Sequence, residues 1–275
     1  MIFDRYWKSM TLASLFILVI SLVILAGNVA STGFPMERDI ELTGGKRVSF
    51  ITDAIDLSKV EELFPDYEVR LYKGTDNSLV ITMPYEADEN SVIEAIKNNF
   101  PIRGEPTSQT IGPAIGEVFW QQAQTTMIMS FIFMSIVVFL LFRSFVPSLI
   151  VLISAITDMT GTMAILSLLG IPLSLPVLAA MIMIVAYSVD TDILLTSSML
   201  KLAGGTAWEA MKTGLTMTSA TFAALLALYF ISGSALLQTM ALVLMVGILV
   251  DIPVTWFTNA GLLRIWLERK SKKGN

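Results

Sequence analysis

Residues 175–199 read LPVLAAMIMIVAYSVDTDILLTSSM, an apolar stretch that contains two aspartates, Asp190 and Asp192. About 20 consecutive apolar residues are enough to span the hydrocarbon core of a bilayer as a helix. A carboxylate at the centre of such a helix costs roughly 2.5–3.5 kcal/mol to insert. The stretch therefore predicts a membrane-spanning helix with a site in it that needs acids despite this cost.

The composition of the 275-residue chain is that of an integral membrane protein. It is 54% hydrophobic and 15% charged, with a mean hydropathy of +0.70, whereas a soluble domain carries about 25% charged residues. The chain has no Cys and no His. Disulfides, thiolate metal sites and histidine bases are therefore excluded. We expect neither enzymatic activity of the hydrolase-triad type nor a metal site.

Six apolar runs are long enough to cross a bilayer. They are residues 10–28, 123–142, 147–169, 175–199, 214–232 and 236–263. The first could be mistaken for a secretory signal, because basic residues precede it. Its apolar run from Met10 to Ala26 exceeds the usual core of about 7–15 residues in such signals, so we expect it to be retained as a helix.

Charge distribution predicts the orientation in the membrane. Residues 33–118 carry 16 acidic and 8 basic residues, whereas the rest of the chain carries 7 and 10. Basic residues flank the spans near Arg143 and Lys212 and crowd the tail. The positive-inside rule places these segments and both termini in the cytoplasm, and residues 33–118 outside the cell membrane. The predicted parts are 1–32 (N-terminus and first span), 33–118 (outer domain), 119–263 (five spans) and 264–275 (basic tail).

The outer segment carries the pattern of a small α+β domain. Alternation of apolar and polar residues predicts strands. Apolar residues at helical spacing after a capping residue predict amphipathic helices. In chain order we expect a strand at 46–52, a helix at 56–64, a hairpin of strands at 67–74 and 78–84 around a GTDN turn, a helix at 88–100 and a strand at 102–111. This β-α-β-β-α-β order is that of a ferredoxin-like unit, a fold that names no function by itself.

Three local patterns resemble one family. They are DIELTGGKRVSF at 39–50, IGPAIGEVF at 111–119 and KTGLTMTSATFAALLALYFISG at 212–233. With one outer domain between the first two spans, they make the chain similar to the SecF family of protein-export membrane proteins. The structural motif residues of this resemblance are Gly44, Gly45, Gly112, Pro113 and Gly116. We expect Gly44 and Gly45 to allow a backbone turn where the chain leaves the membrane.

The chain departs from the bacterial pattern of this family in two places. Before the first strand, bacterial members typically have Gly-x-Asp-Phe-x-Gly-Gly, and here Asp39 and Glu41 stand at the first Gly and the Asp. In the fourth span the bacterial pattern is Tyr-Ser-x-Asn-Asp-Thr, and here the acid is shifted and doubled in Asp190-Thr191-Asp192. These differences resemble the archaeal branch of the family.

The resemblance implies a function and partners. Members are similar in plan to one six-helix half of the resistance-nodulation-division (RND) transporters, so a SecD-like subunit would supply the other half. Further implied partners are the Sec translocation channel, the exported polypeptide and membrane lipids, but no nucleic acid. A proton (or sodium) gradient would drive late steps of export, with that ion in place of any cofactor.

The alternatives are an RND-type half-transporter for a small or lipid-like molecule and a non-energised insertion scaffold. The 86 outer residues are few for a substrate pocket, which favours export.

Asp190 and Asp192 cannot share a helix face, because two residues correspond to a rotation of about 200°. Asp192 falls on a polar stripe with Ser188 and Thr196. Asp190 falls on an apolar stripe that could pack against a neighbouring helix, and at about 22 Å from Leu175 it is the more deeply placed acid. The alternatives are a structural hydrogen bond for Asp190 and solvation by an inner vestibule for Asp192.

Other polar residues of the spans extend this set. Asp158 lies near the predicted midplane beside Thr and Gly residues, which is typical of an ion pathway or of close helix packing alike. Asp251 precedes Pro253 and is interpreted mainly as a structural partner for groups freed by a kink. The fifth span carries hydroxyls that serve either as helix contacts or as ion ligands: Thr213, Thr216, Thr218, Ser219 and Thr221. The ion-coupling candidates are thus Asp190, Asp192, Asp158, Ser188 and Thr218.

Overall fold

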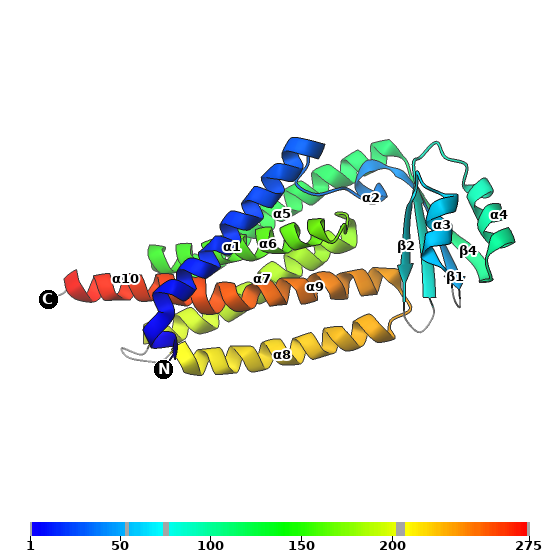
Figure 1. Ribbon diagram of the computed structural model, residues 1–275. Coiled ribbons are helices and arrows are strands. Elements are labelled where there is room, and N and C mark those ends of the chain that lie inside the picture. The colour runs from blue at the N-terminus through cyan, green and yellow to red at the C-terminus, as the bar shows by residue number, and fades with distance from the viewer. Residues whose placement is uncertain (1, 53–54, 74–76, 202–206, 274–275) are drawn as a thin grey trace.

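The computed structural model describes residues 2–52, 55–73, 77–201 and 207–273. Within these residues, six helical segments are long and apolar enough to cross a membrane, as the sequence predicted. They are α1 (Ile2–Thr32), α5 (Pro113–Phe142), α6 (Phe145–Leu168), α7 (Leu175–Lys201), α8 (Ala207–Ile231) and α9 (Ala235–Pro253), the last continuing through η1 (Val254–Asn259) into α10 (Ala260–Lys273). Together they form one bundle with a small sheet domain at one end (Figure 1).

The helices differ in how much of their surface the chain itself covers. α6, α7 and α9 form the centre of the bundle, whereas α1, α5 and α8 leave most of their apolar surface exposed. Phe133 of α5 and Phe230 of α8, for example, are 65% and 67% exposed. Helices that are hydrophobic all round require an apolar environment, so these outer faces are suited to lipid or to another membrane subunit.

The outer domain has the predicted order of elements. These are β1 (Gly45–Thr52), α3 (Leu57–Leu63), β2 (Glu68–Tyr72), β3 (Asn77–Met83), α4 (Glu89–Asn99) and β4 (Ile102–Ile111). The strands pair antiparallel in the order β2-β3-β1-β4, which confirms the ferredoxin-like fold. Residues 74–76 of the predicted turn lie outside the described residues.

One face of this sheet forms a hydrophobic core with α3 and α4. Val48 and Phe50 of β1 lie opposite Ile81 and Leu79 of β3, and all four side chains are fully buried. Because successive side chains of a strand point to opposite faces, the intervening residues form a second face. None of the helices described in the outer domain covers that face, which is turned toward the membrane bundle (Figure 1).

A short helix that the sequence did not predict, α2 (Ile40–Thr43), joins the first span to the sheet. Gly44, at its C-terminus, has a φ of +84°, and a Cβ on it would lie 2.6 Å from the Cα of Pro113. A Cβ on Gly116 would likewise lie 2.6 Å from the main-chain nitrogen of Gly44. Gly112 is the N-cap residue of α5, and Pro113 is its first residue. The glycines therefore permit direct backbone contact between α2 and the start of α5.

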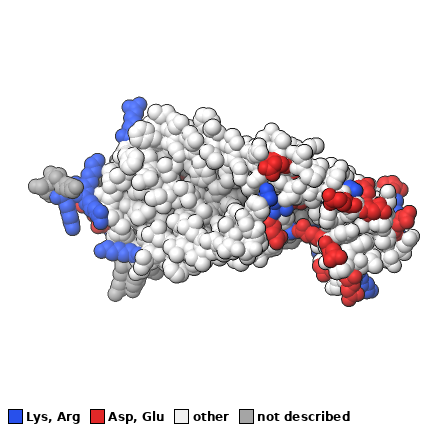
Figure 2. All heavy atoms as spheres, turned by 90° about the horizontal axis from the view of Figure 1, so that it is seen from above, with Lys and Arg blue, Asp and Glu red and all other residues white. Residues whose placement is uncertain are grey.

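Charged residues separate toward the two ends of the molecule. Both termini lie at the end of the bundle opposite the outer domain (Figure 1). Lys and Arg side chains gather at that end, whereas Asp and Glu gather on the outer domain (Figure 2). The bundle surface between the ends is almost uncharged in this view, as expected of a belt in contact with hydrocarbon.

A buried carboxylate cluster between three membrane helices

Three aspartates from three different spans meet in the centre of the bundle. Asp158 of α6, Asp192 of α7 and Asp251 of α9 are 0%, 0% and 1% exposed. They lie close enough to interact electrostatically with one another. None of the ion pairs formed between described residues involves these three carboxylates. Neighbouring carboxylates without a counter-cation cannot all be ionised in an environment of low dielectric constant.

Asp192 receives hydrogen bonds from three directions. Its Oδ1 accepts from Asn259 Nδ2 at 2.6 Å, from Thr255 Oγ1 at 2.8 Å and from Ser154 Oγ at 3.2 Å. Its Oδ2 has no hydrogen-bond partner among the described residues. Concentrating donors on one carboxylate oxygen favours the ionised form, which offsets part of the cost of burying a charge on Asp192.

Asp158 and Asp251 are held by hydroxyl groups. Ser188 Oγ donates to Asp158 Oδ2. Thr191 Oγ1 lies 3.2 Å from Asp251 Oδ2, and Thr255 Oγ1 lies 2.9 Å from Asp251 Oδ1. Thr255 Oγ1 therefore lies within hydrogen-bonding distance of both Asp192 and Asp251.

A break in regular helical geometry positions two of these partners. Pro253 lacks a backbone N–H and disturbs the helical hydrogen bonds of α9, and the six residues after it form the π-helix η1. Both Thr255 and Asn259 belong to η1, and both reach Asp192 on α7. π-Helical turns occur frequently at functional sites, and this one supplies two side chains to the cluster.

The structure brings together only part of the predicted set. Ser188, Asp192 and Thr196 form a fully buried stripe on α7, and Asp158 faces it. Thr218 is buried but lies elsewhere, where its hydroxyl accepts a 2.8 Å hydrogen bond from Tyr187. The side chains of Thr216, Ser219 and Thr221 donate to carbonyls of their own helix, α8.

Asp190 differs most from the expectation. Its side chain is exposed, as is Ala186 one turn earlier, and it does not join the cluster. The two acids do lie on opposite faces of α7, but the face that packs inward is that of Asp192. Asp190 thus lies on the outer surface of the bundle formed by the described residues.

Four members of the site were missed or underrated by sequence reasoning. Asp251 was interpreted mainly as a partner of the kink, and it is instead a full member of the cluster. Ser154, Thr255 and Asn259 were not singled out. The signal for two of them was the spacing of Asp251, Thr255 and Asn259, polar residues four positions apart in an apolar segment.

Comparison with known proteins assigns the family. Residues 91–269 match the family model described as "Protein export membrane protein SecD/SecF, C-terminal". The protein-export membrane protein SecF of Pyrococcus furiosus is 37% identical, with 97% of this chain and 93% of the relative aligned. SecF of Methanolacinia petrolearia is 34% identical, with 97% and 95% aligned. The chain belongs to the SecF family of protein-export membrane proteins. As a SecF-family member it is a multi-pass membrane protein of protein export.

Solved structures show the same fold. The SecF-family chain matches the crystal structure of SecDF from Thermus thermophilus with a TM-score of 0.76 at 20% identity. A super-membrane-facing form of SecDF gives a TM-score of 0.60 at 17% identity. The alignments cover 97% and 99% of this chain but only 38% and 39% of those structures. The chain therefore corresponds to a little over a third of the length of SecDF.

Proposed function

We propose that this protein is an accessory subunit of the Sec translocation machinery which, with a SecD-like partner, uses a proton gradient to promote late steps of polypeptide export. The family membership supports the role in export. The arrangement around Thr255 supports the use of protons. The protein acts as a transport subunit in this proposal, without an enzymatic reaction and without a cofactor other than the coupling ion.

The position of the Thr255 hydroxyl carries the proposal. Its oxygen lies 2.8 Å from Asp192 Oδ1 and 2.9 Å from Asp251 Oδ1. A hydroxyl has one proton to donate and lone pairs to accept. Both contacts are satisfied at once when one carboxyl is protonated and donates to the hydroxyl while the hydroxyl donates its own proton to the other, ionised carboxylate. Reversing the direction of both bonds exchanges these states, so the hydroxyl can relay a proton between the two acids.

The energy that a membrane potential supplies per charge is similar to the cost of placing a carboxylate in the membrane. A membrane potential supplies about 2.3 kcal/mol per elementary charge per 100 mV. Inserting a carboxylate at the centre of a spanning helix costs roughly 2.5–3.5 kcal/mol. Loading or unloading one proton in the cluster therefore changes the relative free energy of helix arrangements by an amount that the gradient can provide.

The surface of the bundle supports an orientation in the membrane and a position for the partner subunit. The basic end of the bundle (Figure 2) favours cytoplasmic termini and an outer domain on the opposite side of the cell membrane. The exposed apolar faces of α1, α5 and α8 offer contact area to lipid and to a second six-helix subunit. Since SecDF structures are more than twice as long as this chain, a SecD-like half is the natural occupant of one of these faces.

Replacement of Asp192 by Asn tests the proposal. In vesicles containing this protein, a SecD-like partner and the translocation channel, export is measured with and without an imposed proton gradient. We expect Asp192→Asn to abolish stimulation by the gradient while the subunits still co-purify. Undiminished stimulation in a variant with Asn at all three cluster positions would refute the proposal and favour a non-energised scaffold. Stimulation that requires a sodium gradient at constant pH would identify sodium as the coupling ion instead.

A further inference from the structure

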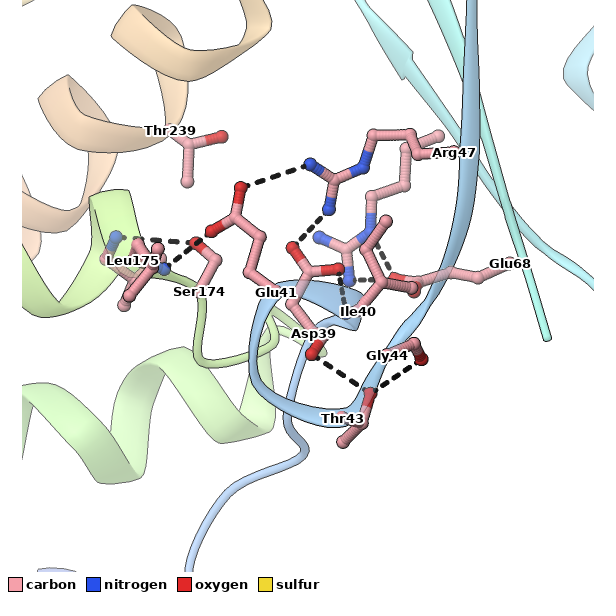
Figure 3. Close-up of polar contacts among 12 residues, drawn as sticks. Asp39, Ile40, Glu41, Thr43, Gly44, Arg47, Glu68, Ser174, Leu175 and Thr239 are labelled. Atoms are coloured by element: carbon pink, nitrogen blue, oxygen red, sulfur yellow. Dashed lines mark hydrogen bonds and ion pairs between the residues drawn. The ribbon is translucent and has the colours of Figure 1, made fainter. Parts of the chain in front are cut away.

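A cleft separates the uncovered face of the outer sheet from the membrane bundle. Its volume is about 480 Å³. Strands β1 to β4 form one wall, and the α6–α7 and α8–α9 connections with the first turns of α7 and α9 form the other. One part of it, where Arg47, Glu41 and Thr239 lie between the sheet and the bundle, is shown in Figure 3.

The sheet wall is rich in neutral groups that form hydrogen bonds. Strand alternation directs them away from the hydrophobic core and toward the bundle. They are Ser49, Ser78, Thr82, Thr107 and Gln109. Between them lie the apolar side chains of Ile51 and Val80 and the ring of Tyr72. This wall offers both donors and acceptors without a net charge of its own.

The charged residues of the cleft are already paired with one another or with neighbours. Arg47 forms ion pairs with Asp39 and, at 3.6 Å, with Glu41 (Figure 3). Arg70 pairs with Glu68 at 2.5 Å and also donates to the carbonyl of Gly170. The remaining acid, Glu105, pairs with Lys97 at 2.7 Å. A charged ligand such as an anionic lipid headgroup would have to break these pairs, so the cleft does not select for charge.

The opposite wall is mainly apolar and also carries hydroxyl groups. Ile171, Pro172, Pro176, Ala235 and Leu236 line it together with Gly233, and the hydroxyl groups come from Ser174, Ser234 and Thr239. A ligand between the two walls thus meets hydrogen-bonding groups on both sides and most of the hydrophobic surface on the bundle side. An extended polypeptide has this character, because its main chain carries regular donors and acceptors while its side chains alternate between two faces.

We propose that this cleft binds an extended segment of the exported polypeptide on the outer side of the membrane. The proposal rests on the proposed function, since it names where the subunit holds its substrate. Four strands spaced about 4.8 Å apart give the sheet wall a width of roughly 14 Å, which matches about four extended residues. Because binding uses neutral hydrogen bonds and apolar contacts, the segment is held with little dependence on its sequence.

The position of the cleft couples occupancy to the bundle. The outer domain touches the membrane connections through a few contacts around the cleft. Arg70 donates to the carbonyl of Gly170, Asp39 N–H donates to the carbonyl of Leu173 at 2.9 Å, and Gln238 Nε2 donates to the carbonyl of Lys73 at 3.0 Å. A change in the arrangement of α6, α7 or α9 therefore alters the width of the cleft directly.

Cross-linking from single cysteines tests the proposal. The chain has no cysteine, so one introduced thiol can be labelled alone with a benzophenone maleimide. Thr107→Cys places the label on the sheet wall of the cleft, and Ser91→Cys places it on α4, on the other side of the sheet. The variants are placed in the full complex with a secreted polypeptide that is stalled by a folded domain at its C-terminus. We expect illumination to cross-link the stalled polypeptide to Thr107→Cys at least tenfold more than to Ser91→Cys.

Other results would overturn the proposal. Equal cross-linking at both positions, or none at either, would show that the substrate does not enter the cleft. A cross-link to the partner subunit that forms equally without substrate would assign the cleft to that partner. Export by each labelled-site variant is measured in parallel to show that it is assembled. Loss of gradient stimulation in Asp192→Asn without any cleft cross-link would leave the proposed function intact and reject only the binding site.

Discussion

The carboxylate of Glu41 accepts a 2.8 Å hydrogen bond from the main-chain N–H of Leu175, the first residue of α7 (Figure 3). The first N–H groups of a helix have no partner within it, and an anion there also interacts favourably with the helix dipole. Asp192 lies on the same helix, about 26 Å further along at 1.5 Å per residue. One rigid element thus connects the outer domain to the carboxylate cluster.

Removing this contact should loosen the outer domain. We expect Glu41→Ala to broaden the distance distribution between spin labels at Thr107→Cys and Leu236→Cys, which lie on opposite walls of the cleft. Gradient-stimulated export should fall in the same variant, because α7 no longer holds α2. The exposed Glu94 of α4 provides the control, Glu94→Ala. Identical distributions in the two variants would argue against a mechanical link through Glu41.

The bridging hydroxyl of Thr255 can be removed almost without change of shape. Thr255→Val removes one hydrogen-bond partner from each of Asp192 and Asp251, a donor from one and an acceptor from the other, which should cost about 1–3 kcal/mol of stability and abolish most gradient stimulation. Thr255→Ser restores the hydroxyl and should restore stimulation. Thr160→Val is the matched control, since that side chain lies outside the cluster, is half-buried and donates to carbonyls of its own helix. If Val and Ser at position 255 support equal stimulation, the relay is wrong.

The backbone contact between α2 and α5 should not tolerate side chains. A Cβ at Gly116 would lie 2.6 Å from the backbone of Gly44, so Gly116→Ala must displace one segment. We expect a loss of about 1–3 kcal/mol, seen as a melting temperature several degrees lower in detergent. Gly27→Ala has no atom within 4 Å of the new Cβ and should be neutral or stabilising, because it improves helix propensity. Equal melting temperatures for the two variants would contradict the packing argument.

The exposed position of Asp190 predicts a role at a subunit interface. An acid on an apolar helix surface is costly in contact with lipid tails, so we expect a polar group of the SecD-like partner or water at their interface to cover it. Asp190→Leu should then reduce co-purification of the partner severalfold, while the melting temperature of the isolated chain stays unchanged. Met183→Leu, at a site that is 51% exposed on the same helix, is the control. Full recovery of the partner with Asp190→Leu would show that this acid lies outside the interface.

The sequence by itself determined the elements. Hydrocarbon cannot satisfy backbone polar groups, so each long apolar run had to form a spanning helix. Alternation in residues 46–52 and 78–84 made those segments strands with one buried face. The four-residue spacing of Ser188, Asp192 and Thr196 likewise placed them on one stripe of α7. Each of these conclusions depends only on residues close together in the chain.

The tertiary structure alone decided how these elements meet. Periodicity showed that Asp190 and Asp192 lie on opposite faces, but the rotation of α7 about its axis depends on packing against α6 and α9. The meeting of Asp158, Asp192 and Asp251 has the same origin, because it joins positions 34 to 93 residues apart. The π-helix after Pro253 then brought Thr255 and Asn259 to Asp192. Such contacts are set by the fit of side chains between helices, a property that no single helix encodes.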